Sequence, residues 1–137
     1  MAFAGINYLA VVVAMIASYV FGSLYYMALS KPWMAAVGKA EAELKANMSA
    51  VPFVTAAIAQ LVMAFMLAGM MGHLGAEAVS LYGGLTTAFW VWIGFVLTTL
   101  VVNHGFQGAK RMLTVIDGGH WLGVLLIQGV VIGLFGI

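Results

Sequence analysis

The chain alternates long apolar stretches with short charged ones. Residues 1–30, 46–76 and 78–109 contain no Asp, Glu, Lys or Arg, and neither does the stretch that follows Asp117. A helix needs roughly 20 apolar residues to cross the hydrocarbon core of a bilayer, where each backbone group must bond within its own segment. Each stretch is long enough for one crossing and too short for two. The pattern therefore predicts four transmembrane helices, at about residues 5–29, 51–72, 78–102 and 115–137.

Two polar loops, at residues 30–50 and 103–113, are predicted on one side of the membrane. In the first, Pro32 cannot donate to a continuing helix and also restricts the residue before it. The charged residues that follow predict a short segment in the membrane interface. By the positive-inside rule both loops are cytoplasmic and both termini lie outside. The rule applies because these loops hold all the basic side chains, namely Lys31, Lys39, Lys45, Lys110 and Arg111.

Composition agrees with a lipid environment. Of the 137 residues, 65% are hydrophobic and 7% are charged, whereas soluble domains are about 45–50% apolar and about 25% charged. The net charge of +1 argues against nucleic-acid binding, which needs a dense basic face. Cysteine is absent, which excludes disulfides, thiolate chemistry and cysteine metal sites. We expect no cofactor and no resident metal.

Polar and ionisable groups within membrane segments are functional candidates by default. Here they are Asp117, His120, His104 and Gln128. A helix through Asp117 and His120 places them on adjacent turns, where they could share a proton or hold a metal together with His104. In the alternative, Asp117 is the N-cap of the fourth helix and its carboxylate accepts the free N–H groups there. His120 then lies near the lipid head groups.

Small residues mark the expected contact surfaces between helices. In the first two spans, Ser18 and Gln60 each belong to a stripe of small or weakly polar residues, which is typical of packing faces in membranes. In the fourth span, two G-x-x-x-G pairs lie on one side, with Asp117 and Gln128 nearly opposite. This predicts neighbours on both faces, one of them a second copy or a partner subunit. The four glycines are Gly119, Gly123, Gly129 and Gly133.

Aromatic and basic side chains near the cytoplasmic ends are expected at the membrane interface. Lys110 and Arg111 are expected to set the orientation and to contact anionic lipid. An aromatic belt is expected from Tyr25, Tyr26, Trp33 and Trp121.

The sequence resembles the membrane proteins grouped as domain of unknown function 1761. The residues that carry the resemblance are Asn7-Tyr8, Gly22 to Tyr26, Trp33-Met34, Trp92 to Phe95, Asn103, Phe106 to Gly108 and Ile116 to His120. The chain departs from the family pattern at Tyr25, where the family has Trp, at Ser30, where the family has Gly, and at Gln107, where the family has an acidic residue. The resemblance implies a small bacterial inner-membrane protein with four spans, and it implies no activity.

The sequence thus predicts an all-α integral membrane protein, a single four-helix transmembrane bundle with a short cytoplasmic interfacial segment. No nucleophile–base pair, phosphate loop or H-E-x-x-H motif is present, so we do not expect an enzyme. The first functional hypothesis is a non-enzymatic membrane protein that acts as a homo-oligomer or as an accessory subunit. The alternative is a transporter or channel for a small solute, coupled to protons, that uses Asp117, His120 and Gln128.

Overall fold

The structure, a computed structural model, describes residues 3–136, and every regular element in that range is helical. Four helices are long and apolar enough to cross a membrane, so the prediction of an all-helical chain with four such helices is confirmed. They are α1 (Tyr8–Ala28), α4 (Val51–Leu74), the continuous helix Leu81–Phe106 and α7 (Arg111–Phe135). The continuous helix consists of α5 (Leu81–Val91), the π-helical η2 (Trp92–Leu97) and α6 (Thr98–Phe106). The short elements are α2 (Ser30–Val37), α3 (Glu41–Ala46) and the 3-10 turn η1 (Ala76–Ala78).

Local chemistry sets the starts of four helices. The side chain of Asn7 accepts a hydrogen bond of 3.1 Å from the Ala10 N–H and so caps α1. Ser80 caps α5 in the same way, through a 3.0 Å bond from the Gly83 N–H. Pro32 and Pro52 lie in the first turns of α2 and α4, where the missing N–H has no partner to lose.

Two predicted boundaries are wrong around the second polar loop. The helix that begins at Leu81 continues to Phe106, and α7 begins at Arg111, so only residues 107–110 connect them. The predicted loop at 103–113 is therefore mostly helical. One polar contact joins the two helices there, between His104 Nδ1 and the Thr114 hydroxyl at 2.8 Å. Residue 137, the predicted end of the last span, lies outside the described residues.

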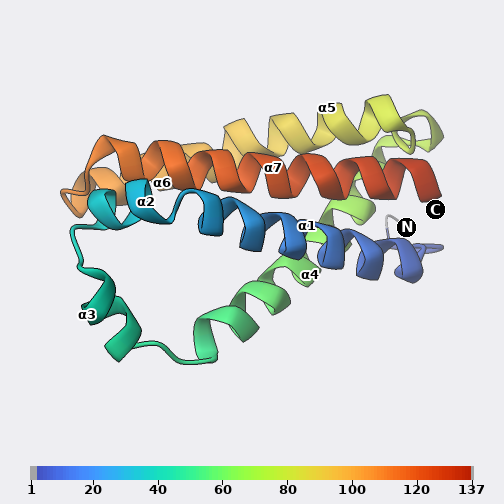
Figure 1. Ribbon diagram of the computed structural model, residues 1–137. Coiled ribbons are helices and arrows are strands. Elements are labelled where there is room, and N and C mark those ends of the chain that lie inside the picture. Colours follow the sequence, from blue (N-terminus) through green and yellow to red (C-terminus); the bar gives the residue numbers. More distant parts are fainter. Residues whose placement is uncertain (1–2, 137) are drawn as a thin grey trace.

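Helix α7 lies in the middle of the molecule. It packs against α5 on one side and α1 on the other, and α4 crosses the bundle obliquely and also contacts it (Figure 1). The first turns of α4 stand away from α1, and α3 joins the two across the opening. Helix α7 therefore contributes buried side chains on several of its faces, among them Ile116, Val124, Leu125 and Ile132.

The basic residues lie at one end of the bundle. Helices α2 and α3 and the connection between α6 and α7 lie there, and both ends of the described chain lie at the other (Figure 1). The Lys110 ammonium donates to the Ala35 carbonyl oxygen at 3.0 Å and so ties the two polar segments together. The structure therefore places the two predicted cytoplasmic segments side by side.

Small side chains let the helices approach closely. The interior contains Ala14, Ala64 and Ala88, all fully buried, packed with larger residues such as Leu67 and Leu125. Without a hydrophobic driving force between helices in lipid, such close packing and polar contacts hold a bundle together.

Candidate functional site

A cavity of about 830 Å³ opens at the basic end of the bundle, where α4 diverges from α1. Its deep wall is formed by Asp117, His120 and Trp121 of α7 together with Tyr26 of α1. Gln60 of α4 contributes a further polar wall. At the mouth, α2 and α3 supply charged side chains, namely Lys31, Glu41 and Lys45. Its volume lies within the range of about 300–1,000 Å³ that is typical of small-molecule sites.

Asp117 lies inside α7, six residues after the helix begins at Arg111. The prediction that Asp117 caps the fourth helix is therefore wrong, because the helix starts nearly two turns earlier. Its carboxylate Oδ1 instead accepts a 2.7 Å hydrogen bond from the Tyr26 hydroxyl of α1. A carboxylate in the interior of a bundle helix has no backbone N–H to neutralise it, so its partners must come from other helices.

His104 of α6 lies on the other side of Asp117. Its Nε2 is 3.8 Å from Asp117 Oδ2, and the side chains of His104 and Asp117 are 12% and 20% exposed. This distance is an ion-pair distance when the imidazole is protonated and too long for a hydrogen bond. A row of polar side chains thus runs from the loop end of α6 to the wall of the cavity, through His104, Asp117 and Tyr26.

His120 is buried among aromatic rings, and the expected place near lipid head groups is wrong. Only 5% of the residue is exposed, and its ring lies 4.7 Å from that of Tyr26 and 4.6 Å from that of Trp121, between centroids. It fits against α1 because Gly22 faces it without a side chain. Within the described residues, its Nδ1 has no hydrogen-bond partner.

A buried polar cluster joins three helices behind the cavity. The Gln128 amide donates to the Ser18 hydroxyl and to the Gln60 carbonyl oxygen, both at 3.0 Å, and the Ser18 hydroxyl lies 2.8 Å from Gln60 Oε1. All three side chains are at most 2% exposed. The prediction that Ser18 and Gln60 lie on packing faces is confirmed, and the structure links Gln128 to both. Gln60 also lines the cavity, so the cluster reaches its wall.

The π-helical segment η2 faces α7 next to Asp117. Bonds from residue i to i+5 widen the turn, so residues five apart lie closer to one face than they would in an α-helix. Trp92 and Leu97 accordingly both meet Gly118: the Trp92 indole N–H donates to the Gly118 carbonyl oxygen at 2.8 Å, and Leu97 packs against the Gly118 backbone. The α7 backbone is fixed from the other side by the Tyr25 hydroxyl, which donates to the Ile116 carbonyl oxygen at 2.7 Å.

The four glycines of α7 face the chain's own helices. Gly119 and Gly123 lie against Tyr25 and Phe21 of α1. Gly129 and Gly133 lie against the backbone at Gly84 and Ser80, where α5 begins. The fourth span has neighbours on both faces, as predicted, but these neighbours belong to the same chain.

The predicted interfacial side chains lie at the basic end, with a different orientation for two of them. The hydroxyls of Tyr25 and Tyr26 donate hydrogen bonds to α7, where the Ile116 carbonyl oxygen and the Asp117 carboxylate accept them. Trp33 and Trp121 are half-buried and line or border the cavity. Arg111 is exposed at the first turn of α7, and the aromatic belt itself stays a prediction.

Sequence reasoning missed the roles of Tyr26 and Trp92. Tyr26 was expected to face the interface, and its bond to Asp117 could only be found once α1 and α7 were known to be neighbours. The π-helical turn at Trp92 has no sequence signal of its own. Neither residue could be assigned from spacing along one helix.

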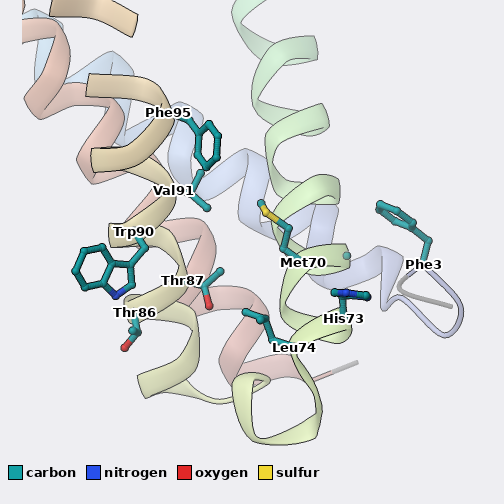
Figure 2. A pocket seen from close by; sticks show the side chains of 10 residues that line it. Phe3, Met70, His73, Leu74, Thr86, Thr87, Trp90, Val91 and Phe95 are labelled. Atoms are coloured by element: carbon teal, nitrogen blue, oxygen red, sulfur yellow. The ribbon is translucent and has the colours of Figure 1, made fainter. Parts of the chain in front are cut away.

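A second cavity, of about 460 Å³, lies at the opposite end between α4 and the helix that begins at Leu81. Figure 2 shows Met70 of α4 and Val91 of α5 pointing toward one another across it, with His73 near its end. The lining is almost entirely apolar, with Thr86 and Thr87 as further polar residues. Because it lacks a buried charged group, it is the weaker candidate for a solute site.

Among residues 3–136, no three His, Asp or Glu side chains gather closely enough to hold a metal ion. His104 and Asp117 are close to each other, while His120 lies among aromatic rings on the cavity wall. The arrangement can therefore hold a proton or a polar solute at Asp117, next to an aromatic surface.

Comparison with known proteins places the chain in a family. No curated protein and no solved structure matches it. The family model described as "Protein of unknown function (DUF1761)" matches residues 9–133, which is nearly the whole chain. The match includes the helices that build the cavity and all four of its deep-wall residues, so the resemblance seen in the sequence is confirmed. The protein belongs to the DUF1761 family.

Proposed function

We propose that this protein is a multi-pass membrane protein that carries a small organic solute across the membrane, with Asp117 holding either the solute or a proton. The observation that carries the proposal is the cavity of about 830 Å³ whose deep wall contains the carboxylate of Asp117. A carboxylate within a membrane helix is costly and marks a pathway for ions or solutes by default.

The topology supports access from one side. In our proposal the four long helices cross the inner membrane of a bacterial cell. The end that bears Lys31, Lys45 and Lys110 faces the cytoplasm, by the positive-inside rule. The cavity opens at that end, between α2, α3 and α4. A solute would therefore enter from the cytoplasm or from the inner surface of the bilayer.

The surroundings of Asp117 favour exchange between a proton and a solute. The titratable groups near it are Tyr25 and Tyr26 from α1 and His104 from α6, and His120 lies three residues further along its own helix, against Tyr26. Of these, His104 is the group that lies nearest the loop end, so it is the natural donor and acceptor of the proton. Lys31, Glu41 and Lys45 lie at the mouth of the same cavity.

The first hypothesis from the sequence, an oligomer or accessory subunit, becomes the alternative here. That hypothesis rested on a fourth span with two marked faces, one of them left for a partner. Helices α1 and α5 of the same chain cover the glycine face, and Ser18 and Gln60 meet Gln128 on the other.

The test is solute-dependent proton movement in proteoliposomes that contain a pH-sensitive dye. We expect a panel of small amphipathic solutes to include some that move protons through the wild-type protein and not through Asp117→Asn. The matched control is Glu77→Gln, which removes an exposed carboxylate at the opposite end, in η1, and should leave the flux intact. If Asp117→Asn, inserted at the same level, transports as the wild type does, the proposal is wrong.

A further inference from the structure

The ligand class follows from three features of the same cavity, and the inference rests on the proposed solute site. The first feature is the hydrogen bonding of the Asp117 carboxylate. Asp117 Oδ1 is occupied by the Tyr26 hydroxyl, while Oδ2 receives no hydrogen bond from residues 3–136 and lies 3.8 Å from His104 Nε2. The side chain is 20% exposed, and it is part of the cavity wall. Within the described residues, the carboxylate is thus held at the wall of the cavity by a single hydrogen bond, the one from Tyr26.

The second feature is the aromatic surface that lines the cavity together with Asp117. The rings of Tyr26 and His120 are 4.7 Å apart, those of His120 and Trp121 are 4.6 Å apart, and those of Tyr26 and Trp33 are 6.3 Å apart, between centroids. All four residues line the cavity. Aromatic faces attract a cation, tryptophan most strongly, and the attraction grows when the cation leaves water. An anion finds no such surface favourable.

The third feature is the balance of charge along the cavity. At the mouth, Lys45 Nζ lies 2.9 Å from Glu41 Oε1. The hydrogen bond between them lowers the pKa of Glu41 and raises that of Lys45, so both stay charged and neutralise each other. Lys31 is the remaining cation at the mouth, on exposed α2. The deep wall carries the negative charge of Asp117, and the lining between mouth and wall includes Met34, Leu44, Met48 and Phe53.

We infer that the cavity binds an amphipathic organic cation, an ammonium group on an aromatic or aliphatic body. The ammonium lies at the Asp117 carboxylate and against the faces of Tyr26, Trp33 and Trp121. The body fills the apolar part of the cavity toward α3 and α4. The volume of about 830 Å³ suits such a molecule and far exceeds a bare metal ion.

The experiment measures binding to the purified full chain in phosphatidylcholine nanodiscs, through the fluorescence of the cavity tryptophans. Three probes of one shape separate the possibilities: benzyltrimethylammonium, its uncharged carbon analogue neopentylbenzene, and the anion phenylmethanesulfonate. We expect the cation to bind saturably, and both other probes to bind at least about tenfold more weakly, as expected for a desolvated cation–π and ionic contact. Trp121→Phe should remove most of the signal, because Trp121 lines the site.

Asp117→Asn should weaken binding of the cation by at least about tenfold and leave that of neopentylbenzene unchanged. Trp33→Leu gives an independent test should Asp117→Asn fail to insert. It removes a half-buried ring at the cavity edge and should weaken only the cation, by about fivefold.

The outcomes distinguish the inference from the proposed function. If the neutral probe or the anion binds as tightly as the cation, or if both variants bind the cation like the wild type, the organic-cation inference is overturned while a solute site in this cavity stands. If none of the three probes changes the fluorescence of the wild type, the inference is overturned too. The proposed function then depends on the proton-flux assay alone.

Discussion

Gly84 of α5 and Gly129 of α7 lie backbone to backbone, and each occupies the space that a side chain on the other would need. A Cβ added at either residue would overlap the carbonyl oxygen of the other. Such close approach permits weak Cα–H···O contacts and dense packing between the helices. This contact fixes α7 against α5, and α7 in turn carries Asp117 and His120.

Replacing either glycine should separate these helices. We expect Gly84→Ala or Gly129→Ala to lower the free energy of unfolding by about 1–3 kcal/mol, the usual cost of overpacking, measured by thermal or denaturant unfolding in detergent. The control is Gly105→Ala in α6, where a Cβ would meet nothing within 4 Å and φ is negative. It should be neutral or stabilising, because alanine favours helices. Equal effects of the two kinds of variant would contradict the close-contact interpretation.

The contact between Gly22 and His120 should be testable by second-site rescue. A Cβ at Gly22 would lie 2.6 Å from His120 Nε2, so Gly22→Ala must push the imidazole toward Tyr26 and Trp121. We expect a loss of stability of about 1–3 kcal/mol, and a weaker affinity for solutes in the cavity. In a His120→Ala background the same substitution should cost much less, because the obstructing ring is gone. A cost that stays the same in both backgrounds would show that His120 is not what Gly22 accommodates.

The Ser18–Gln60–Gln128 cluster should behave as one unit. Gln128→Leu removes two hydrogen bonds from the interior, and Gln60→Leu removes the acceptor next to Ser18. Each should destabilise the protein by about 1–2 kcal/mol in detergent or bicelles. The double variant should cost less than the sum, since the two glutamines share partners. Gln107→Leu, in the exposed connection between α6 and α7, is the control and should change little. Strict additivity of the two buried changes would argue against the cluster.

The orientation can be measured because the chain contains no cysteine. A single cysteine at Ala76, in η1, should react with a membrane-impermeant maleimide added to intact cells. A cysteine at Gln107, in the connection at the basic end, should react only after the membrane is opened. Both positions are exposed, so access to water is matched. The reverse pattern of labelling would place the cavity mouth on the outer side and overturn the direction of access proposed above.

The indole N–H of Trp92 should contribute to the stability of the protein, because it bonds to the α7 backbone next to Asp117. Trp92→Phe keeps an aromatic ring and loses the 2.8 Å bond to the Gly118 carbonyl oxygen. We expect a cost of about 1 kcal/mol, the net value of one intramolecular hydrogen bond. Trp90→Phe is the control, because Trp90 is largely exposed and lines only the second cavity. The free energy of unfolding is measured for both variants under the same conditions. An equal loss of stability for both would contradict a special role of the Trp92 bond in the π-helical turn.

The sequence was enough to identify the polar candidate residues, but it was not enough to identify the residues that they contact. Asp117, His120, His104 and Gln128 were found because polar groups are rare in an apolar chain. Their contacts with Tyr26, Ser18 and Gln60 were not found, since these residues lie on other helices and 68 or more residues away. The capping hypothesis for Asp117 failed because Asp117-Gly118-Gly119 looks like a helix start, whereas the mostly apolar run from Arg111 to Ile116 already belongs to the helix.

The sequence by itself determined the four apolar helices, the gathering of all basic residues at one end, and the few polar side chains worth attention. These properties depend on composition along the chain, because transfer into hydrocarbon is a sum over the residues of one segment. The tertiary structure alone decided that the glycines of α7 face α1 and α5, that Tyr26 holds Asp117, and that a cavity opens where α4 leaves α1. Those properties depend on which helices are neighbours and how they rotate, and helical periodicity fixes neither.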